Sequence, residues 1–175
     1  MDGSMNGKLA SASSLPLPPT VVNADIIETH KENIVPTRDG RSATAISQLY
    51  SVPRAQRVKH LTEQHAFHRQ AIANPPDPDD PLAPYCSYVQ WTTENYPSGS
   101  SSESGLFALL EEVTRKFHAD DEYKYDRRYV KLWLQYAHLS EHSQRVLAYM
   151  IANDIGTMQA TPYEEYAEVL ERNGK

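Results

Sequence analysis

Pairs of aromatic residues spaced three positions apart recur along this 175-residue chain and constrain its fold more than any other feature. The pairs are Tyr85 with Tyr88, Trp133 with Tyr136, and Tyr163 with Tyr166. Two residues three apart lie on the same face of an α-helix, and apolar residues at helical spacing surround each pair. The pattern therefore predicts an all-α chain in which repeated helical units bury their aromatic faces against one another.

The pairs follow one another after 48 and then 30 residues. The second interval is close to the ~34-residue period of a tetratricopeptide unit, and a Ser-rich stretch at 96–104 lengthens the first. We therefore expect a tetratricopeptide-like helical domain over residues 55–175, truncated at its C-terminus as the N-terminal piece of a longer protein. Aromatic stripes at helical spacing usually pack into a core rather than form a ligand cage. The predicted structural core is Tyr85, Tyr88, Trp91, Trp133, Tyr136, Tyr163 and Tyr166.

Six helices are expected in this domain from the spacing of apolar residues. They cover residues 55–73, about 85–91, 106–117, 127–139 and 141–153, with a sixth that opens at 161. For the sixth helix we predict Thr161 as the N-cap, Pro162 in the first turn and Glu164 at the capping-box position. An acidic turn over 118–122 separates the third helix from the fourth.

The first 52 residues have a different character. Residues 1–22 are rich in Ser and Pro without periodicity, which predicts a disordered leader. Residues 23–52 are interpreted as a helix capped by Asn23, a loop, and a second helix that follows Gly40. This segment looks too short to bury its own apolar stripe, so we expect it to order fully only on a partner.

The loop of that segment carries the tripeptide Lys31-Glu32-Asn33, a KEN motif. It combines a mobile cation, a carboxylate and an amide that both donates and accepts, which is typical of a recognition element rather than of a core. Pro36 should end any helix that runs through the motif, since it biases the preceding residue away from helical geometry. We assign partner binding to Lys31, Glu32 and Asn33 and, on the flanking helices, to Ile27, Arg41, Ile46 and Leu49.

Charge and hydropathy exclude several classes of partner. Residues 1–60 carry a net charge of +2 and the remaining residues −8, so the helical portion is a poor match for a phosphate backbone. No apolar run is long enough to span a bilayer, and the N-terminus lacks the pattern of a signal peptide. We therefore expect no nucleic-acid and no membrane partner.

Catalytic, cofactor and metal sites are also not expected. Cys86 is the single cysteine, which excludes a disulfide framework and a thiolate zinc site. His60, His65 and His68 lie on one predicted helix but lack a convergent carboxylate, so a polar helix face is the better interpretation. The sequence contains no phosphate-binding glycine loop, no Gly-x-Ser-x-Gly elbow and no kinase motif.

Several blocks, in this order, resemble the Bub/Mad family of mitotic spindle-assembly checkpoint proteins, and most closely its KEN-bearing BubR-type branch. The blocks are the KEN motif with Pro36 and Gly40-Arg41, WTTENYPSG at 91–99, YKYDRRYVKLWLQYA at 123–137, IGT at 155–157 and YEEYAEVLE at 163–171. The resemblance covers roughly residues 24–50 and 56–172.

The resemblance implies a protein of the nucleus and kinetochore, with a cytoplasmic pool. In this family the KEN box docks as a pseudosubstrate on the β-propeller co-activator of the anaphase-promoting complex. The flanking helices lie against that co-activator and a HORMA-domain checkpoint protein, forming an inhibitory mitotic checkpoint complex. The helical domain supports this assembly and, in some members, binds a short motif of a kinetochore scaffold protein.

Two alternatives remain open at this stage. The chain could be the N-terminal regulatory and kinetochore-targeting region of a checkpoint Ser/Thr kinase, because some family members carry a C-terminal kinase domain. It could instead be a helical scaffold whose KEN motif is only a degradation signal.

Overall fold

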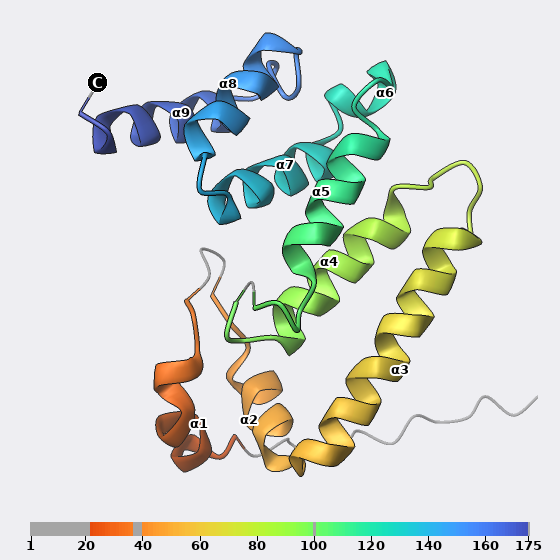
Figure 1. Ribbon diagram of the computed structural model, residues 1–175, viewed down its shortest axis with the longest axis vertical. Helices are drawn as coiled ribbons and strands as arrows, with labels where there is room; N and C mark the ends of the chain where they lie inside the picture. The colour runs from red at the N-terminus through yellow and green to blue at the C-terminus, as the bar shows by residue number, and fades with distance from the viewer. Residues whose placement is uncertain (1–21, 37–39, 100, 175) are drawn as a thin grey trace, which may run out of the picture.

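The computed structural model describes residues 22–36, 40–99 and 101–174, and these ranges contain helices and no strand (Figure 1). The elements are α1 Ala24–His30, the 3₁₀ turn η1 Lys31–Asn33, α2 Ala43–Ser51, α3 Arg54–Ala73, α4 Ala83–Asn95, α5 Leu106–Lys116, α6 Asp121–Lys124, α7 Arg127–Leu139, α8 Ser143–Ala152 and α9 Thr161–Arg172. The all-α prediction is confirmed. The leader predicted to be disordered lies, apart from Val22, outside the described residues.

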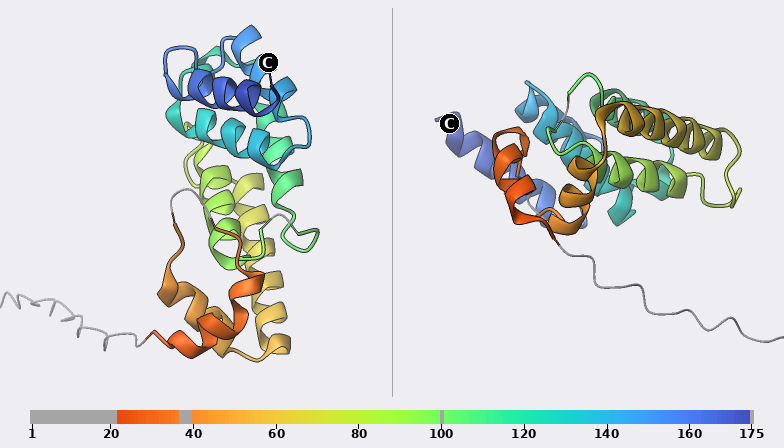
Figure 2. Two further views of the ribbon diagram at one scale, coloured as in Figure 1. Left: turned by 90° about the vertical axis from the view of Figure 1, so that its left-hand side faces the viewer. Right: turned by 90° about the horizontal axis from the view of Figure 1, so that it is seen from below.

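The helices form a stack in which neighbours along the chain pack on one another. From α3 to α9 the contacts run α3 to α4, α4 to α5, α5 to α7, α7 to α8 and α8 to α9, while α1 packs on α2 and α2 also contacts α4. We call the described part of residues 23–51 the N-terminal arm. The arm lies at one end of the molecule and α8 and α9 at the other (Figures 1 and 2).

A continuous core of aromatic and aliphatic side chains runs through α4, α5, α7 and α8. Its members include Tyr85, Tyr88, Leu109, Leu110, Val113, Tyr129, Val130, Trp133, Leu147, Met150 and Ile155. Tyr129 is fully buried, and its hydroxyl donates a hydrogen bond to the carbonyl oxygen of Thr114 at 2.7 Å. This bond satisfies a polar group that would otherwise be costly to bury.

The residues predicted to form the core differ in their burial. Tyr85, Tyr88 and Trp133 are buried, whereas Trp91, Tyr136 and Tyr166 are partly buried and pack against the core. Tyr163 is 44% exposed, so its assignment to the core is wrong.

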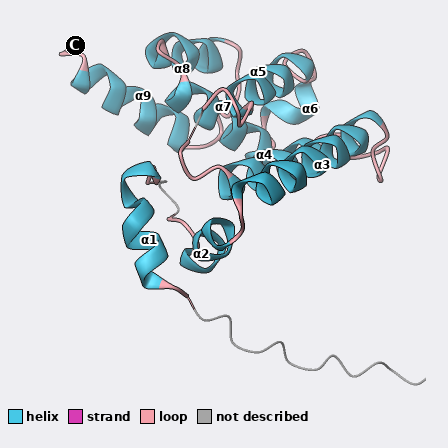
Figure 3. Cartoon of the chain, turned by 60° about the horizontal axis from the view of Figure 1, so that its bottom comes forward, coloured by secondary structure: helices cyan, strands magenta, loops and turns pink. Residues whose placement is uncertain are grey.

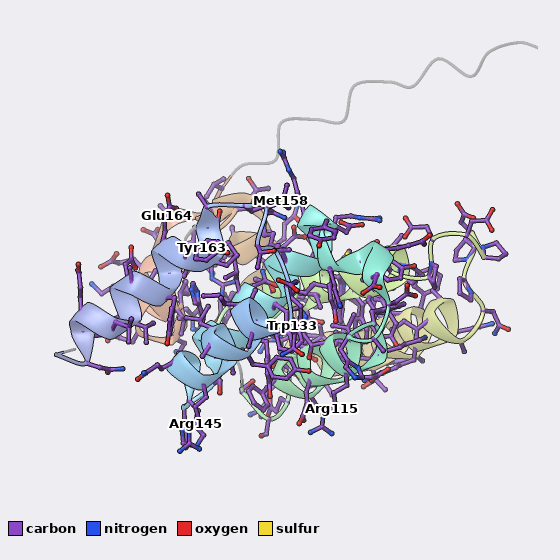
Figure 4. The ribbon with its side chains drawn as sticks, turned by 90° about the horizontal axis from the view of Figure 1, so that it is seen from above. Arg115, Trp133, Arg145, Met158, Tyr163 and Glu164 are labelled. Carbon is purple, nitrogen blue, oxygen red and sulfur yellow. The ribbon has the colours of Figure 1, made fainter. Side chains whose placement is uncertain are left out.

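The inward face of α9 explains why Tyr163 is exposed. Pro162 and Glu165 are buried, and Tyr166 and Val169 pack against the core, so the buried stripe passes beside Tyr163. The Glu165 carboxylate lies 2.9 Å from His138 Nε2 of α7, which compensates part of its burial. Tyr163 therefore projects from the first turn of α9, in the region of Met158 and Glu164 (Figure 4).

Helix ends agree with the predictions to different degrees. Asn23 caps α1 as predicted, since its Oδ1 accepts from the N–H of Ile26 at 3.2 Å. The capping box predicted for α9 is wrong, because Ala160 is the N-cap and makes no side-chain capping bond. Its carbonyl already accepts from the N–H groups of Tyr163 and Glu164, so the helix begins one residue earlier. The predicted acidic turn overlaps the short helix α6.

Candidate partner-binding site

The KEN motif forms a tight helical turn rather than the open loop that was predicted. The backbone N–H of Lys31 bonds to the carbonyl of Glu28 at the end of α1, and the N–H of Ile34 bonds to the carbonyl of Lys31 at 3.1 Å. Lys31, Glu32 and Asn33 are all exposed. The turn therefore presents three different polar groups to solvent on an ordered backbone.

Only one of these three side chains has a partner among the described residues. Lys31 Nζ lies 2.5 Å from Glu28 Oε1, and the two side chains are 58% and 73% exposed. An ion pair so open to solvent contributes about 0–1 kcal/mol, so it yields easily to a stronger acceptor. Within the described ranges no hydrogen bond or ion pair engages the side chains of Glu32 and Asn33, which leaves both available to a ligand.

The arm packs within the chain, α1 on α2 and α2 on α4, so its apolar stripe is covered partly by a helix from outside the arm. Ile46 of α2 is 5% exposed. The ring of His30 stacks on Tyr50 with 4.1 Å between centroids, and the N–H of Asn23 donates to Ser47 Oγ at 3.0 Å. Pairing α1 with α2, and α2 with α4, supplies the neighbours that two isolated helices lack.

The flanking residues predicted to contact partners are therefore partly reassigned. Ile46 faces the interior and Arg41 donates hydrogen bonds to backbone carbonyls of the same chain, so in this structure neither offers its side chain to a partner. Ile27 and Leu49 are partly buried, so each still exposes part of its side chain. Sequence spacing identified the apolar stripe of the arm but not the helix that covers it.

A second candidate site is a groove of about 330 Å³ on the helical domain. It is lined by Glu111, Thr114, Arg115, His118, Trp133, Tyr136, Arg145, Val146 and Tyr149. The Tyr149 ring stacks on Trp133 at 5.5 Å and is 42% exposed. Arg115 and Arg145 project at the edge of the molecule with Trp133 behind them (Figure 4). Arg115 pairs with Glu111 of the same rim at 2.7 Å, and Arg145 adds a second cation. An aromatic floor with this rim suits a short segment that combines apolar and acidic side chains.

Sequence reasoning placed Trp133 and Tyr136 in the core and did not recognise this groove. Trp133 does both, because it is 6% exposed, stacks on Tyr149 of α8 and still lines the groove. The exposure of Tyr149 depends on how α7 and α8 cross, and no spacing rule in the sequence predicts that angle.

His65 and His68 act in the structure as links between α3 and α4. The nitrogens Nδ1 and Nε2 of His65 lie 2.6 and 2.7 Å from the hydroxyl oxygens of Tyr88 and Tyr96, and the His68 ring stacks on Tyr88. Burial lowers the pKa of both imidazoles, and the positive charge of Arg69 lowers the pKa of His65 further. The predicted polar face therefore describes only His60, which is exposed.

The described part of the chain offers neither a metal-binding cluster nor a helix that could span a membrane. No group of three or more His, Cys, Asp or Glu residues is placed so that it could hold a metal ion there. None of the described helices is both long enough and apolar enough to cross a membrane.

Comparison with known proteins decides the family. A family model described as Mad3/BUB1 homology region 1 matches residues 63–175, which is well over half of the chain. The chain belongs to this Mad3/BUB1 family. The matched region runs from within α3 to the end of the chain and includes the groove, while the N-terminal arm with the KEN turn precedes it.

Individual relatives match more of the chain than the family model does, including residues that precede residue 63. The mitotic spindle checkpoint component mad3 of Schizosaccharomyces pombe is 35% identical over 154 residues, which cover 87% of this chain and 50% of the relative. The mitotic spindle checkpoint protein BUBR1 of Arabidopsis thaliana is 34% identical over 149 residues, covering 85% of this chain and 37% of the relative. The chain thus spans half or less of the length of these relatives.

Solved structures bear out the predicted fold. A chain of a crystal structure of the mitotic checkpoint complex is 35% identical and superposes with a TM-score of 0.81, covering 88% of this chain and 72% of that chain. The conserved N-terminal domain of the mitotic checkpoint component BUB1 is 25% identical with a TM-score of 0.62, over 69% of this chain and 64% of that one. The prediction of a tetratricopeptide-like helical domain is confirmed for this Mad3/BUB1 member.

Proposed function

We propose that this chain is a component of the spindle-assembly checkpoint whose KEN turn docks as a pseudosubstrate on the β-propeller co-activator of the anaphase-promoting complex. The observation that carries the proposal is the exposed, ordered turn of Lys31, Glu32 and Asn33 at the end of α1. The likeness to a chain of the mitotic checkpoint complex supports it. Such inhibition requires only that the chain occupy the pocket where substrates bind, with no catalysis of its own.

The size of the turn implies that it acts together with other contacts. Three exposed side chains bury little area. Binding also has to offset the translational and rotational freedom that two molecules lose when they associate. A second contact on the same molecule multiplies the affinity through effective concentration. We propose that the helical domain and a HORMA-domain checkpoint protein supply that second contact within an inhibitory complex.

A second binding function is favoured by the groove on the helical domain. The rings of Trp133, Tyr136 and Tyr149 offer an apolar floor, and Arg145 offers positive charge at its edge, beside the ion pair of Arg115 with Glu111. We propose that the groove receives a short apolar and acidic motif of a kinetochore scaffold protein. This would place the protein at the kinetochore and in the nucleus, with a cytoplasmic pool.

One alternative is that the chain is the regulatory N-terminal region of a checkpoint kinase. The human mitotic checkpoint serine/threonine-protein kinase BUB1 beta is 28% identical over 165 residues, which cover 94% of this chain but only 15% of that protein. The similarity therefore lies in a small part of the kinase chain. Sequence beyond Lys175 with a lysine-bearing glycine loop and a His-Arg-Asp loop would favour the kinase.

Binding of purified proteins tests the docking proposal. Replacement of Lys31, Glu32 and Asn33 by alanine should lower the affinity for the co-activator and HORMA pair by at least about 100-fold, because the pocket contact and its avidity are lost together. The matched control is Lys59→Ala with Glu63→Ala, which removes one cation and one anion whose side chains are 80% and 62% exposed. Unchanged affinity of the triple variant would refute docking through the KEN turn.

A further inference from the structure

Two sequence motifs about fifty residues apart meet in the structure. They are the Gly-Arg pair after the KEN turn and the WTTENYPSG run that ends α4. Arg41 Nη1 donates to the carbonyl oxygen of Thr93 at 2.6 Å, and Arg41 Nε donates to the carbonyl oxygen of Val35 at 2.6 Å. The N–H of Val35 donates to the carbonyl oxygen of Pro97 at 2.8 Å. We call these three hydrogen bonds the arm latch.

The end of α4 explains why an arginine is needed at this place. In a continuing helix the Thr93 carbonyl would accept from the N–H of residue 97, but proline has no N–H. Carbonyl groups in the last turn of a helix need donors and interact favourably with positive charge. Arg41 meets both needs from a distant segment. The Pro97 carbonyl, on the other side, is the acceptor for Val35.

The same region allows a close approach of the two segments. Gly99 has a φ of +84°, and a Cβ added there would lie 3.4 Å from Cγ2 of Val35. The arm and the loop after α4 therefore pass one another in contact at Val35 as well as being hydrogen-bonded.

The latch lies next to the KEN turn in the chain. Val35 is two residues beyond Asn33, so the chain is attached to the loop after α4 directly after the motif. Before the motif, α1 is attached to α2 through the stacking of His30 on Tyr50. Figure 3 shows α1 and α2 beside each other, and α2 in turn contacts α4. The turn is thus attached to the rest of the molecule on both of its sides.

We propose that Arg41 is a positioning residue: the arm latch presents the KEN turn in one orientation relative to the helical domain. This inference rests on the proposed docking function and adds a role for Arg41 that differs from direct partner contact. A partner assembly that touches both the turn and the helical domain then meets a preorganised two-part ligand. Preorganisation removes the ordering of the arm from the free-energy cost of binding.

Hydrogen exchange on the whole chain tests the latch without any partner. In Arg41→Gln, the amide of Val35 and the amides of the arm should exchange at least about tenfold faster, because the arm opens locally while the helical domain stays folded. Amides of α5, α7 and α8 should be unchanged, and Arg127→Gln, at an exposed arginine of α7, is the matched control. Unchanged exchange at Val35 in Arg41→Gln would overturn the latch.

Affinity measurements then separate positioning from direct contact. Arg41→Gln should weaken binding to the co-activator and HORMA pair by about 10- to 100-fold, but binding to the isolated β-propeller by less than about threefold. Arg41→Lys, which can reach one carbonyl, should be intermediate.

The outcomes distinguish this inference from the docking proposal. An equal loss for both binding partners would mean that Arg41 contacts the co-activator itself and would overturn the positioning role. No loss in either, with the KEN alanine variant still defective, would also overturn it and leave docking intact. If the KEN alanine variant binds normally, docking fails, and the exchange experiment still decides whether the latch exists.

Discussion

The N-terminal arm and the helical domain are held together in different ways. The domain has a continuous core in which Leu110, Val113 and Tyr129 are fully buried, whereas Ile46 is the buried apolar residue of the arm. The arm depends instead on a cap, a ring stack and the latch to α4. Burial of apolar area supplies most of the stability of a domain, while hydrogen bonds contribute less and depend on direction. The domain is therefore built for stability and the arm for orientation.

The largest effect is expected from replacing an aromatic residue of the core. Trp133→Ala should lower the free energy of unfolding by about 3–5 kcal/mol, because it removes a buried ring that stacks on Tyr149 of α8. Tyr163→Ala is the matched control and should cost less than about 1 kcal/mol, since Tyr163 is 44% exposed. Denaturant unfolding followed by circular dichroism measures both. A near-normal stability of Trp133→Ala would assign Trp133 to the surface.

The exposure of Tyr163 also marks the limit of what the sequence predicts. Helical periodicity identified the stack, because one face of each helix must be apolar and the 3.6-residue repeat makes that face readable. The same spacing placed Tyr163 with Tyr166, although residues three apart differ by about 60° around a helix and only Tyr166 packs against the core.

The candidate partner-binding site, too, could be predicted from the sequence only in part. The identity and exposure of Lys31, Glu32 and Asn33 follow from three polar residues beside a Pro36 stop. The role of Arg41 does not, because it depends on a carbonyl at Thr93 that lacks its usual donor, and this becomes visible only when two distant segments are placed together. The groove depends likewise on how α7 crosses its neighbours.

A smaller effect is expected from the cap of the arm. Asn23→Ala removes the acceptor for the N–H of Ile26 and should destabilise α1 by about 1 kcal/mol. Because the arm contributes little to the core, the change should appear as exchange about fivefold faster in α1, with the global unfolding transition unchanged. Hydrogen exchange combined with thermal unfolding measures both. A fall in global stability of the same size would contradict the separation of arm and domain.

The smallest effect concerns pH and the link between α3 and α4. Burial, and then the neighbouring Arg69 and His68, lower the pKa of His65 from its ordinary 6.5. In acid the unfolded chain therefore binds this proton before the folded chain does. The stabilising contribution is complete above pH 6.5 and declines as the pH falls from there towards the lowered folded-state pKa.

Comparison of unfolding free energies at pH 7 and pH 5 measures this effect. The wild type should lose more stability over that interval than His65→Gln, which has no imidazole to protonate at the same position between Tyr88 and Tyr96. An identical loss in both proteins would mean that His65 does not contribute to acid sensitivity.

The most direct test of the account asks whether the KEN turn makes this chain an inhibitor of the anaphase-promoting complex or one of its substrates. The measurement is the rate at which the purified anaphase-promoting complex with its co-activator ubiquitinates a separate KEN-bearing substrate, at increasing concentrations of this chain and its HORMA partner. The account predicts that the wild type slows that reaction and that higher substrate concentration restores it, whereas the variant with alanine at Lys31, Glu32 and Asn33 has no effect. Ubiquitination of the wild-type chain itself, without slower modification of the other substrate, would contradict the account and identify the motif as a degradation signal.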